Sequence, residues 1–241
     1  MQRNSNSFII FFLFLFLFLS PAHAQTVFGR KLTIGGQYAG GNTRLNSLHF
    51  EYYLNRNRKL TDELTTKGSL DYESNDGVDT VFKAYTFLRY AYSMGDDLYH
   101  FYKLEMEHDR FQDVDLRLIP TIGIGYWFRN DDTFRFTIEG AIGYQRNYLL
   151  NSVADEMVVL KLSTFFMLWA FSNDFDVFVD TADLNNFRFV NEMTYKIKLN
   201  THYAFKWMFK NEFNNRPAAG IQKNDLRTTL GLEYAFKKTV E

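Results

Sequence analysis

The 241-residue sequence contains no cysteine and only three prolines, and its charges nearly cancel. The absence of cysteine excludes a disulfide-linked scaffold, a thiolate metal site and a cysteine nucleophile. Lys and Arg number 27 against 28 Asp and Glu, a balance that does not favour binding to nucleic acid. The mean hydropathy of -0.29 and the 23% of charged residues exclude a bundle of transmembrane helices. Neither value excludes a membrane protein that is built from strands.

The first 24 residues have the pattern of a secretory signal peptide. Arg3 supplies a positive charge, residues 8–19 form an apolar run, and Ala22-His23-Ala24 is an A-x-A cleavage site. The run is shorter than the about 20 residues that a transmembrane helix needs, although an uncleaved anchor is the alternative. We therefore expect residues 1–24 to be a cleaved signal peptide and residues 25–241 to form one domain.

After Gln25 the sequence alternates between apolar and polar residues with a period of two, and no segment shows the 3.6-residue period of a helix. Phe134, Phe136 and Ile138, for example, alternate with polar residues. The pattern predicts about twelve strands, with ten as the alternative. The predicted strands are residues 31–40, 48–55, 62–73, 80–92, 97–109, 116–128, 133–145, 156–171, 176–184, 187–199, 202–213 and 229–236.

The connections between these strands favour a membrane barrel over a soluble sandwich. Short turns rich in Gly, Asn and Asp alternate with longer polar links, as periplasmic turns alternate with external loops in outer-membrane barrels. The predicted turns are residues 57–59, 94–97, 129–132, 172–174 and 199–201, and the predicted long links are 74–80, 110–115, 146–155 and 214–224. Aromatic residues, 18% of the chain, crowd the strand ends as interfacial girdles do. We predict an all-β, antiparallel transmembrane β-barrel in a bacterial outer membrane.

The polar face of the predicted strands carries charges of both signs. The candidate lumen-lining residues are Lys83, Arg89, Lys103, Glu105, Glu107, Arg117, Arg135, Glu139, Lys161, Glu192 and Lys196. These charges either form ion pairs that fill a narrow barrel or line a water-filled path for small solutes. The near balance of signs favours the paired arrangement.

The last predicted strand resembles the C-terminal strands that barrel-assembly machinery recognises. Gly231, Tyr234 and Phe236 provide the glycine and the alternating aromatic residues of such a signal. Signals of this kind usually end on the aromatic residue, whereas here residues 237–241 follow. We expect these five residues to form a short charged tail in the periplasm.

Two groups of residues raise the possibility of catalysis, and neither makes a convincing site. Ser47 and His49 share one face of a predicted strand, a spacing that suits a nucleophile and its base. The pair also needs a third orienting group and access to lipid, whereas its face carries Glu51 as well and is predicted to line the lumen. Asp113 and Asp115 lie in a predicted external loop that contains no histidine. No histidine pair has metal-ligand spacing, and no glycine-rich phosphate loop occurs. We therefore expect no enzymatic activity, metal or cofactor.

Three stretches resemble a known family. Residues 38–43 with the strand at 48–56 are similar to an opening G-N-T hairpin, and residues 215–225 are similar to the family's closing loop. Asp109, Arg110, Asp115 and Arg117 match a D-R-F-x-x-x-D-L-R loop. Over residues 33–236 the chain resembles the salt-induced outer membrane proteins, a YdiY-like domain-of-unknown-function family. The resemblance implies a barrel in the outer membrane and supplies no activity or catalytic residue.

The leading functional hypothesis is a narrow channel or a structural, salt-stress-related barrel of a Gram-negative-type envelope. The alternatives are an outer-membrane hydrolase of lipid or peptide, and a secreted soluble β-barrel that binds an apolar ligand. The expected partners are outer-membrane lipid and lipopolysaccharide, with the barrel-assembly machinery and periplasmic chaperones during biogenesis.

Overall fold

The computed structural model describes residues 26–36, 38–39, 45–58, 61–75, 78–131, 133–149, 155–217 and 222–240. The predicted signal peptide, Asn42 and Thr43 of the G-N-T motif, and part of the closing loop lie outside these residues. The elements are β1 (Thr26–Gly36), β2 (Tyr38–Ala39), β3 (Leu45–Arg58), β4 (Asp62–Asn75), β5 (Val78–Ser93), β6 (Leu98–Asp109), the 3-10 turn η1 (Arg110–Gln112), β7 (Val114–Asn130), β8 (Phe134–Leu149), β9 (Asp155–Leu168), β10 (Phe171–Asp180), β11 (Phe187–Lys198), β12 (Tyr203–Asn214) and β13 (Asn224–Val240). No helix of the described part is long and apolar enough to cross a membrane.

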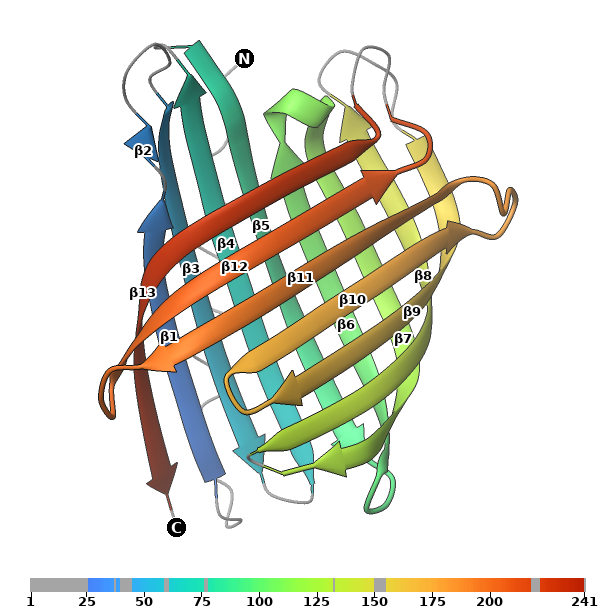
Figure 1. Cartoon of the computed structure of the whole chain (residues 1–241). Coiled ribbons are helices and arrows are strands. Elements are labelled where there is room, and N and C mark those ends of the chain that lie inside the picture. The colour runs from blue at the N-terminus through green and yellow to red at the C-terminus, as the bar shows by residue number, and fades with distance from the viewer. Residues whose placement is uncertain are drawn as a thin grey trace, which may run out of the picture.

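The strands close into an antiparallel barrel. From β3 onward each strand pairs with the next one in sequence, and β1 closes the ring by pairing with both β13 and β3. The two-residue β2 pairs with β3 alongside β1, so the wall contains twelve strands. Figure 1 shows these strands tilted around a common axis. The predicted twelve-stranded antiparallel barrel is confirmed, and the ten-stranded alternative is wrong.

The barrel carries its apolar residues outside and its charges inside. Leu230 and Leu232 on β13 are each 48% exposed, whereas Lys83 is 2% and Lys161 is 4% exposed. The other long strands show the same arrangement, with apolar side chains exposed and charged side chains buried. Successive side chains of a strand point to opposite faces, so each strand contributes to both surfaces. A lipid-facing wall with a polar lumen has this distribution, and a soluble sandwich has the opposite one. The alternative of a soluble barrel with an apolar interior is therefore wrong.

The two ends of the barrel differ in their connections. The end that contains the C-terminus of β13 carries the short turns, and the opposite end carries η1 and the longer links (Figure 1). Asp131 organises one of these turns, since its Oδ1 accepts hydrogen bonds from the Thr133 hydroxyl at 2.7 Å and from the backbone of Phe134 at 2.7 Å. These bonds, first that of the Thr133 hydroxyl, lower the pKa of the Asp131 carboxyl.

One predicted turn is wrong. Residues 172–174 belong to β10, and the chain reverses instead at Trp169 and Ala170. Trp169 has a φ of 51°, a conformation that sequence patterns assign to Gly or Asn. The strand predicted over residues 176–184 consequently begins and ends earlier, at Phe171–Asp180. The polar residues 172–174 resemble a turn in the sequence because Asp174 faces the polar lumen. Asp is compatible with a lumen-facing position as well as with a turn.

Two further connections differ from the predictions. The link predicted over residues 74–80 is short, because β4 continues to Asn75 through a bulge after Glu73 and β5 begins at Val78. The predicted free tail is strand up to Val240, which pairs with Thr26. Gly35 and Gly231 face each other across the same β1–β13 seam, where a Cβ on Gly35 would lie 2.9 Å from the Gly231 Cα. These glycines allow the two strands to approach closely.

Candidate functional site in the barrel lumen

The candidate site is the lumen, because the structure places all the predicted lumen charges there. Each lies on the strand face opposite the exposed apolar residues: Lys83, Arg89, Lys103, Glu105, Glu107, Arg117, Arg135, Glu139, Lys161, Glu192 and Lys196. Most of them contact a residue of opposite charge within 4 Å. The lumen is therefore filled with paired charges.

The centre of the lumen is crossed by ion pairs between strands that are not neighbours. Lys67 on β4 places its Nζ 2.9 Å from Glu192 Oε1 on β11 and 3.2 Å from Glu51 Oε2 on β3. Lys206 on β12 donates to Glu51 Oε1 at 2.6 Å. A chain of alternating charges thus connects β11, β4, β3 and β12 through the interior.

A second group of charges connects β6, β9 and β10. Lys161 Nζ lies 3.0 Å from Glu105 Oε2 and 2.8 Å from Asp176 Oδ2. Lys103 and the Tyr85 hydroxyl hold the other oxygen of Glu105, at 3.0 Å and 2.7 Å. Each buried charge here has partners, which offsets its cost of desolvation.

The end of the lumen near the short turns contains an ion pair set among aromatic residues. Arg89 Nη2 lies 2.6 Å from Glu139 Oε1, and the Tyr99 hydroxyl donates to the same oxygen at 2.7 Å. The guanidinium of Arg89 also lies over the rings of Tyr99 and Phe101, 5.4 Å and 5.0 Å from their centroids. Cation–π contacts of this kind fix the arginine in place.

Toward the other end, three carboxylates surround one ammonium. Glu107, Asp109 and Glu212 have ligand oxygens within 4.8 Å of one another, a spacing that would suit a metal ion. Lys83 Nζ lies among them, 2.8 Å from Glu107, 3.4 Å from Asp109 and 2.5 Å from Glu212. The lysine therefore takes the place of a cation in this group.

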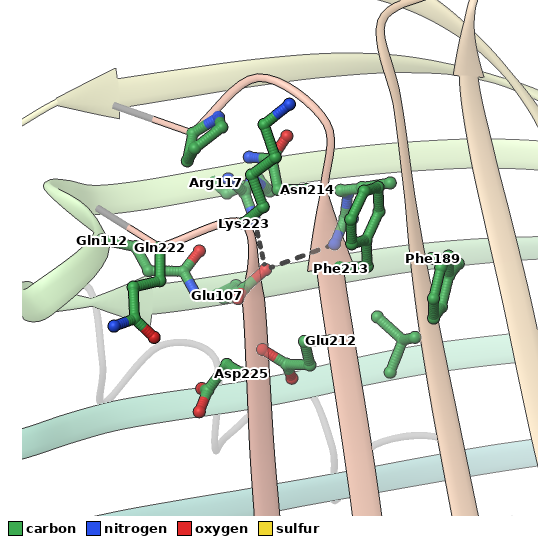
Figure 2. A pocket seen from close by; sticks show the side chains of 13 residues that line it. Glu107, Gln112, Arg117, Phe189, Glu212, Phe213, Asn214, Gln222, Lys223 and Asp225 are labelled. Atoms are coloured by element: carbon green, nitrogen blue, oxygen red, sulfur yellow. Dashed lines mark hydrogen bonds and ion pairs between the residues drawn. The ribbon is translucent and has the colours of Figure 1, made fainter. Parts of the chain in front are cut away.

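A cavity of about 300 Å³ opens above this group, on the side of the longer links. Arg117, Arg188, Gln145, Asn147 and Phe178 contribute to its lining. Arg117 is paired there with Glu107 at 2.8 Å (Figure 2). Its Nε also donates to Asn147 Oδ1 at 2.9 Å. Deeper in the lumen, among the central ion pairs, lies a cavity of only about 80 Å³. A separate cavity of about 160 Å³ lies between β3, β4 and β13, beside His49, Asp71 and Arg227.

Several residues of this network were not among the predicted site residues. They are Glu51, Lys67, Asp174, Asp176, Arg188, Lys206, Lys210, Glu212 and Glu233. The alternation of the strands could have identified most of them, because residues separated by an even number of positions share a face of a strand. Arg188, for example, lies four residues before Glu192 on β11 and therefore points to the same side. Asp174 was not among the predicted lumen residues because the turn was predicted at residues 172–174.

The motif at residues 109–117 divides between the two faces of the wall. Asp109 and Arg117 face the lumen and join its ion pairs. Asp115 accepts a hydrogen bond through its carbonyl from His108 Nδ1 at 2.7 Å, and Arg110 is an exposed residue of η1. The motif therefore connects the rim to the lumen network.

The other predicted residues lie as follows. His49 is buried in the lumen, and its Nδ1 lies 2.6 Å from Asp71 Oδ1 on β4, an orienting partner that the sequence pattern alone does not reveal. Tyr234 and Phe236 of the C-terminal signal are 41% and 40% exposed on the outer wall, and Gly231 is buried at the seam.

A comparison with protein-family models finds a match described as "Protein of unknown function, DUF481" over residues 32–236. The chain belongs to the DUF481 family. This finding agrees with the family resemblance of the sequence motifs. Among curated proteins, nothing matches the DUF481 chain.

Solved structures similar to this DUF481 chain are outer-membrane barrels. The NanC porin has 10% identity and a TM-score of 0.50, with 88% of this chain and 99% of the porin covered. An outer membrane channel from Pseudomonas putida F1 has 11% identity and a TM-score of 0.48, with 90% and 97% covered. The translocator domain of the autotransporter NalP from Neisseria meningitidis has 10% identity and a TM-score of 0.45, with 96% and 95% covered. At 10% identity the likeness to the NanC porin shows the fold of the DUF481 chain alone: an antiparallel β-barrel.

Proposed function

We propose that the protein resides in the outer membrane of a Gram-negative-type cell and forms a narrow, non-enzymatic channel that its own ion pairs hold closed. One observation carries the proposal: ion pairs between strands that are not neighbours occur from one end of the lumen to the other. They are Arg89–Glu139, Lys161–Glu105, Lys67–Glu192, Lys206–Glu51 and Lys83–Glu212.

The remaining space supports a closed resting state. The central cavity of about 80 Å³ has room for at most about five to eight waters, since each needs at least about 10–15 Å³. A hydrated solute passes only when side chains in the lumen move apart. Water and small ions are the species that such a path admits.

The outer wall and the last strand define the proposed partners. Exposed Leu, Ile and aromatic side chains on the outer wall face lipid and, in the outer leaflet, lipopolysaccharide. During biogenesis the strand that ends in Tyr234 and Phe236 is read by the barrel-assembly machinery after periplasmic chaperones deliver the chain.

Planar-bilayer recordings of refolded protein test the proposal. We expect wild-type protein to give very small conductance steps and the double variant Lys67→Ala/Glu192→Ala to give steps several times larger. The matched control is Arg129→Ala/Asp131→Ala, which removes an ion pair of 2.6 Å in an exposed turn and should leave conductance unchanged. Wide-open wild-type steps, or a double variant that conducts no better than wild type, would contradict closure by ion pairs.

A further inference from the structure

Arg188 is the only described residue that lines all three of the lumen cavities around β11. It is the second residue of β11, and its side chain lines the cavity of about 300 Å³, the central cavity of about 80 Å³ and the small pocket of Figure 2 between them. A solute that moves from the outer cavity toward the centre therefore passes this guanidinium.

Arg188 is half-buried, and its charge is the least compensated of the non-exposed cations that line these cavities. Within the described part of the chain its one ion pair under 4 Å joins Nη1 to Glu107 Oε2 at 3.9 Å, longer than a hydrogen bond. Glu107 is already held by Lys83 and Arg117, each at 2.8 Å. The Nε of Arg188 is buried without a hydrogen-bond partner. A guanidinium that is largely removed from water and short of acceptors is costly unless an anion pairs with it.

Arg188 is nevertheless held firmly. Its guanidinium carbon lies 3.9 Å from the centroid of the Phe178 ring, a close cation–π contact. A guanidinium fixed on an aromatic ring and short of acceptors is organised to receive a carboxylate, since charge-assisted hydrogen bonds are the strong ones.

The rest of the outer cavity indicates the size and polarity of the ligand. Its volume is at the lower end of the range for small-molecule sites, about 300–1,000 Å³. Buried amides of Gln145 and Asn147 offer hydrogen bonds to hydroxyl groups, and Met157 and Val159 supply apolar surface. Asp180, which also lines the cavity, disfavours a second negative charge on the ligand.

We propose that Arg188 forms a binding site for a small hydroxylated monocarboxylate, of about the size of a sugar acid. The inference rests on the proposed channel function, because it names the solute that enters the lumen from the side of the longer links. Arg188 would receive the carboxylate, and the amides above it would bind the hydroxyl groups.

Equilibrium binding to detergent-refolded, full-length barrel tests the site without any conductance measurement. The probe is D-glucuronate, with D-glucose as the neutral control of similar size and inorganic phosphate as a competing anion. We expect glucuronate to bind at least about tenfold more tightly than glucose, a difference of about 1.4 kcal/mol. Arg188→Gln should weaken glucuronate binding about tenfold, Arg188→Lys should retain part of it, and Arg129→Gln should change nothing.

Stability in the absence of ligand separates a binding role from a structural one. Because Arg188 is under-compensated, ligand-free Arg188→Gln should unfold at the same urea concentration as wild type or a higher one. Equal binding of glucuronate by wild type and Arg188→Gln, equal binding of glucose and glucuronate, displacement by equimolar phosphate, or a marked loss of stability in Arg188→Gln would each overturn the assignment. A failure of this kind leaves the conductance result standing, so the two proposals fail separately.

Discussion

Replacing Lys83 by methionine removes an ammonium that contacts Glu107, Asp109 and Glu212 in the interior of the barrel. The three carboxylates stay within 4.8 Å of one another, in a site where the lysine side chain is only 3% exposed. Glu107 retains Arg117 at 2.8 Å, and Glu212 retains Lys210 at 2.6 Å. The substitution is therefore equivalent to removing one partner of a single buried ion pair, which lowers the free energy of unfolding by about 3–5 kcal/mol.

Urea unfolding in phospholipid vesicles, followed by tryptophan fluorescence, measures this loss for Lys83→Met. Lys198→Met, at an exposed lysine of β11, is the matched control and should change stability by less than about 0.5 kcal/mol. Two additions should restore part of the stability: neutralising one carboxylate in Lys83→Met/Asp109→Asn, and Ca²⁺, which binds clustered carboxylate oxygens. Equal stability of Lys83→Met and wild type would refute the view that this ammonium holds the three carboxylates together.

Three further predictions address the packing, a turn and the absence of catalysis. Gly125→Val should destabilise the barrel by about 1–3 kcal/mol in the same assay, because a Cβ there would overlap the Tyr99 ring. The hydroxyl of Thr133 lowers the pKa of Asp131 in the folded protein. The ionised Asp131 therefore stabilises the fold above the carboxyl's unfolded-state pKa of about 3.9, and this contribution is lost as the pH falls below that value. The difference in urea midpoint between wild type and Asp131→Asn should shrink accordingly with acidification. Ser47→Ala and His49→Ala should hydrolyse a fluorogenic lipid ester no more slowly than wild type, and loss of a measurable wild-type rate in both variants would contradict a non-enzymatic barrel.

The strands were predictable because a barrel wall imposes a strict period of two on the sequence. Lipid selects the residues on one face and the charged lumen selects those on the other, so the alternation persists over strands of up to 17 residues. The same chemistry explains the misplaced turn. Asp174 and Asp176 face the lumen, and Asp within a lumen-facing strand looks like Asp in a turn when only the sequence is read.

The identity of the lumen residues was predictable, and their partners were not. Parity along the strand assigns Lys67 and Glu192 to the inner face, but they belong to β4 and β11, which are far apart in sequence and in the strand order. Which charges meet depends on the diameter and stagger of the closed barrel. The poor compensation of Arg188 depends on the same geometry, so a pattern of residues alone does not reveal it.

The seam between β1 and β13 has a consequence for how the chain can be cut and joined. Thr26 and Val240 are paired residues, so the first and last strands are neighbours in the same way as any two strands that a turn connects. The order of the strands around the barrel therefore follows their order in the chain, and the β1–β13 seam is the one place in the described wall where neighbouring strands come from opposite ends of the chain. A circular permutant in which a short linker joins the end of β13 to the start of β1, with new termini at residues 76–77, would retain every pairing in the wall.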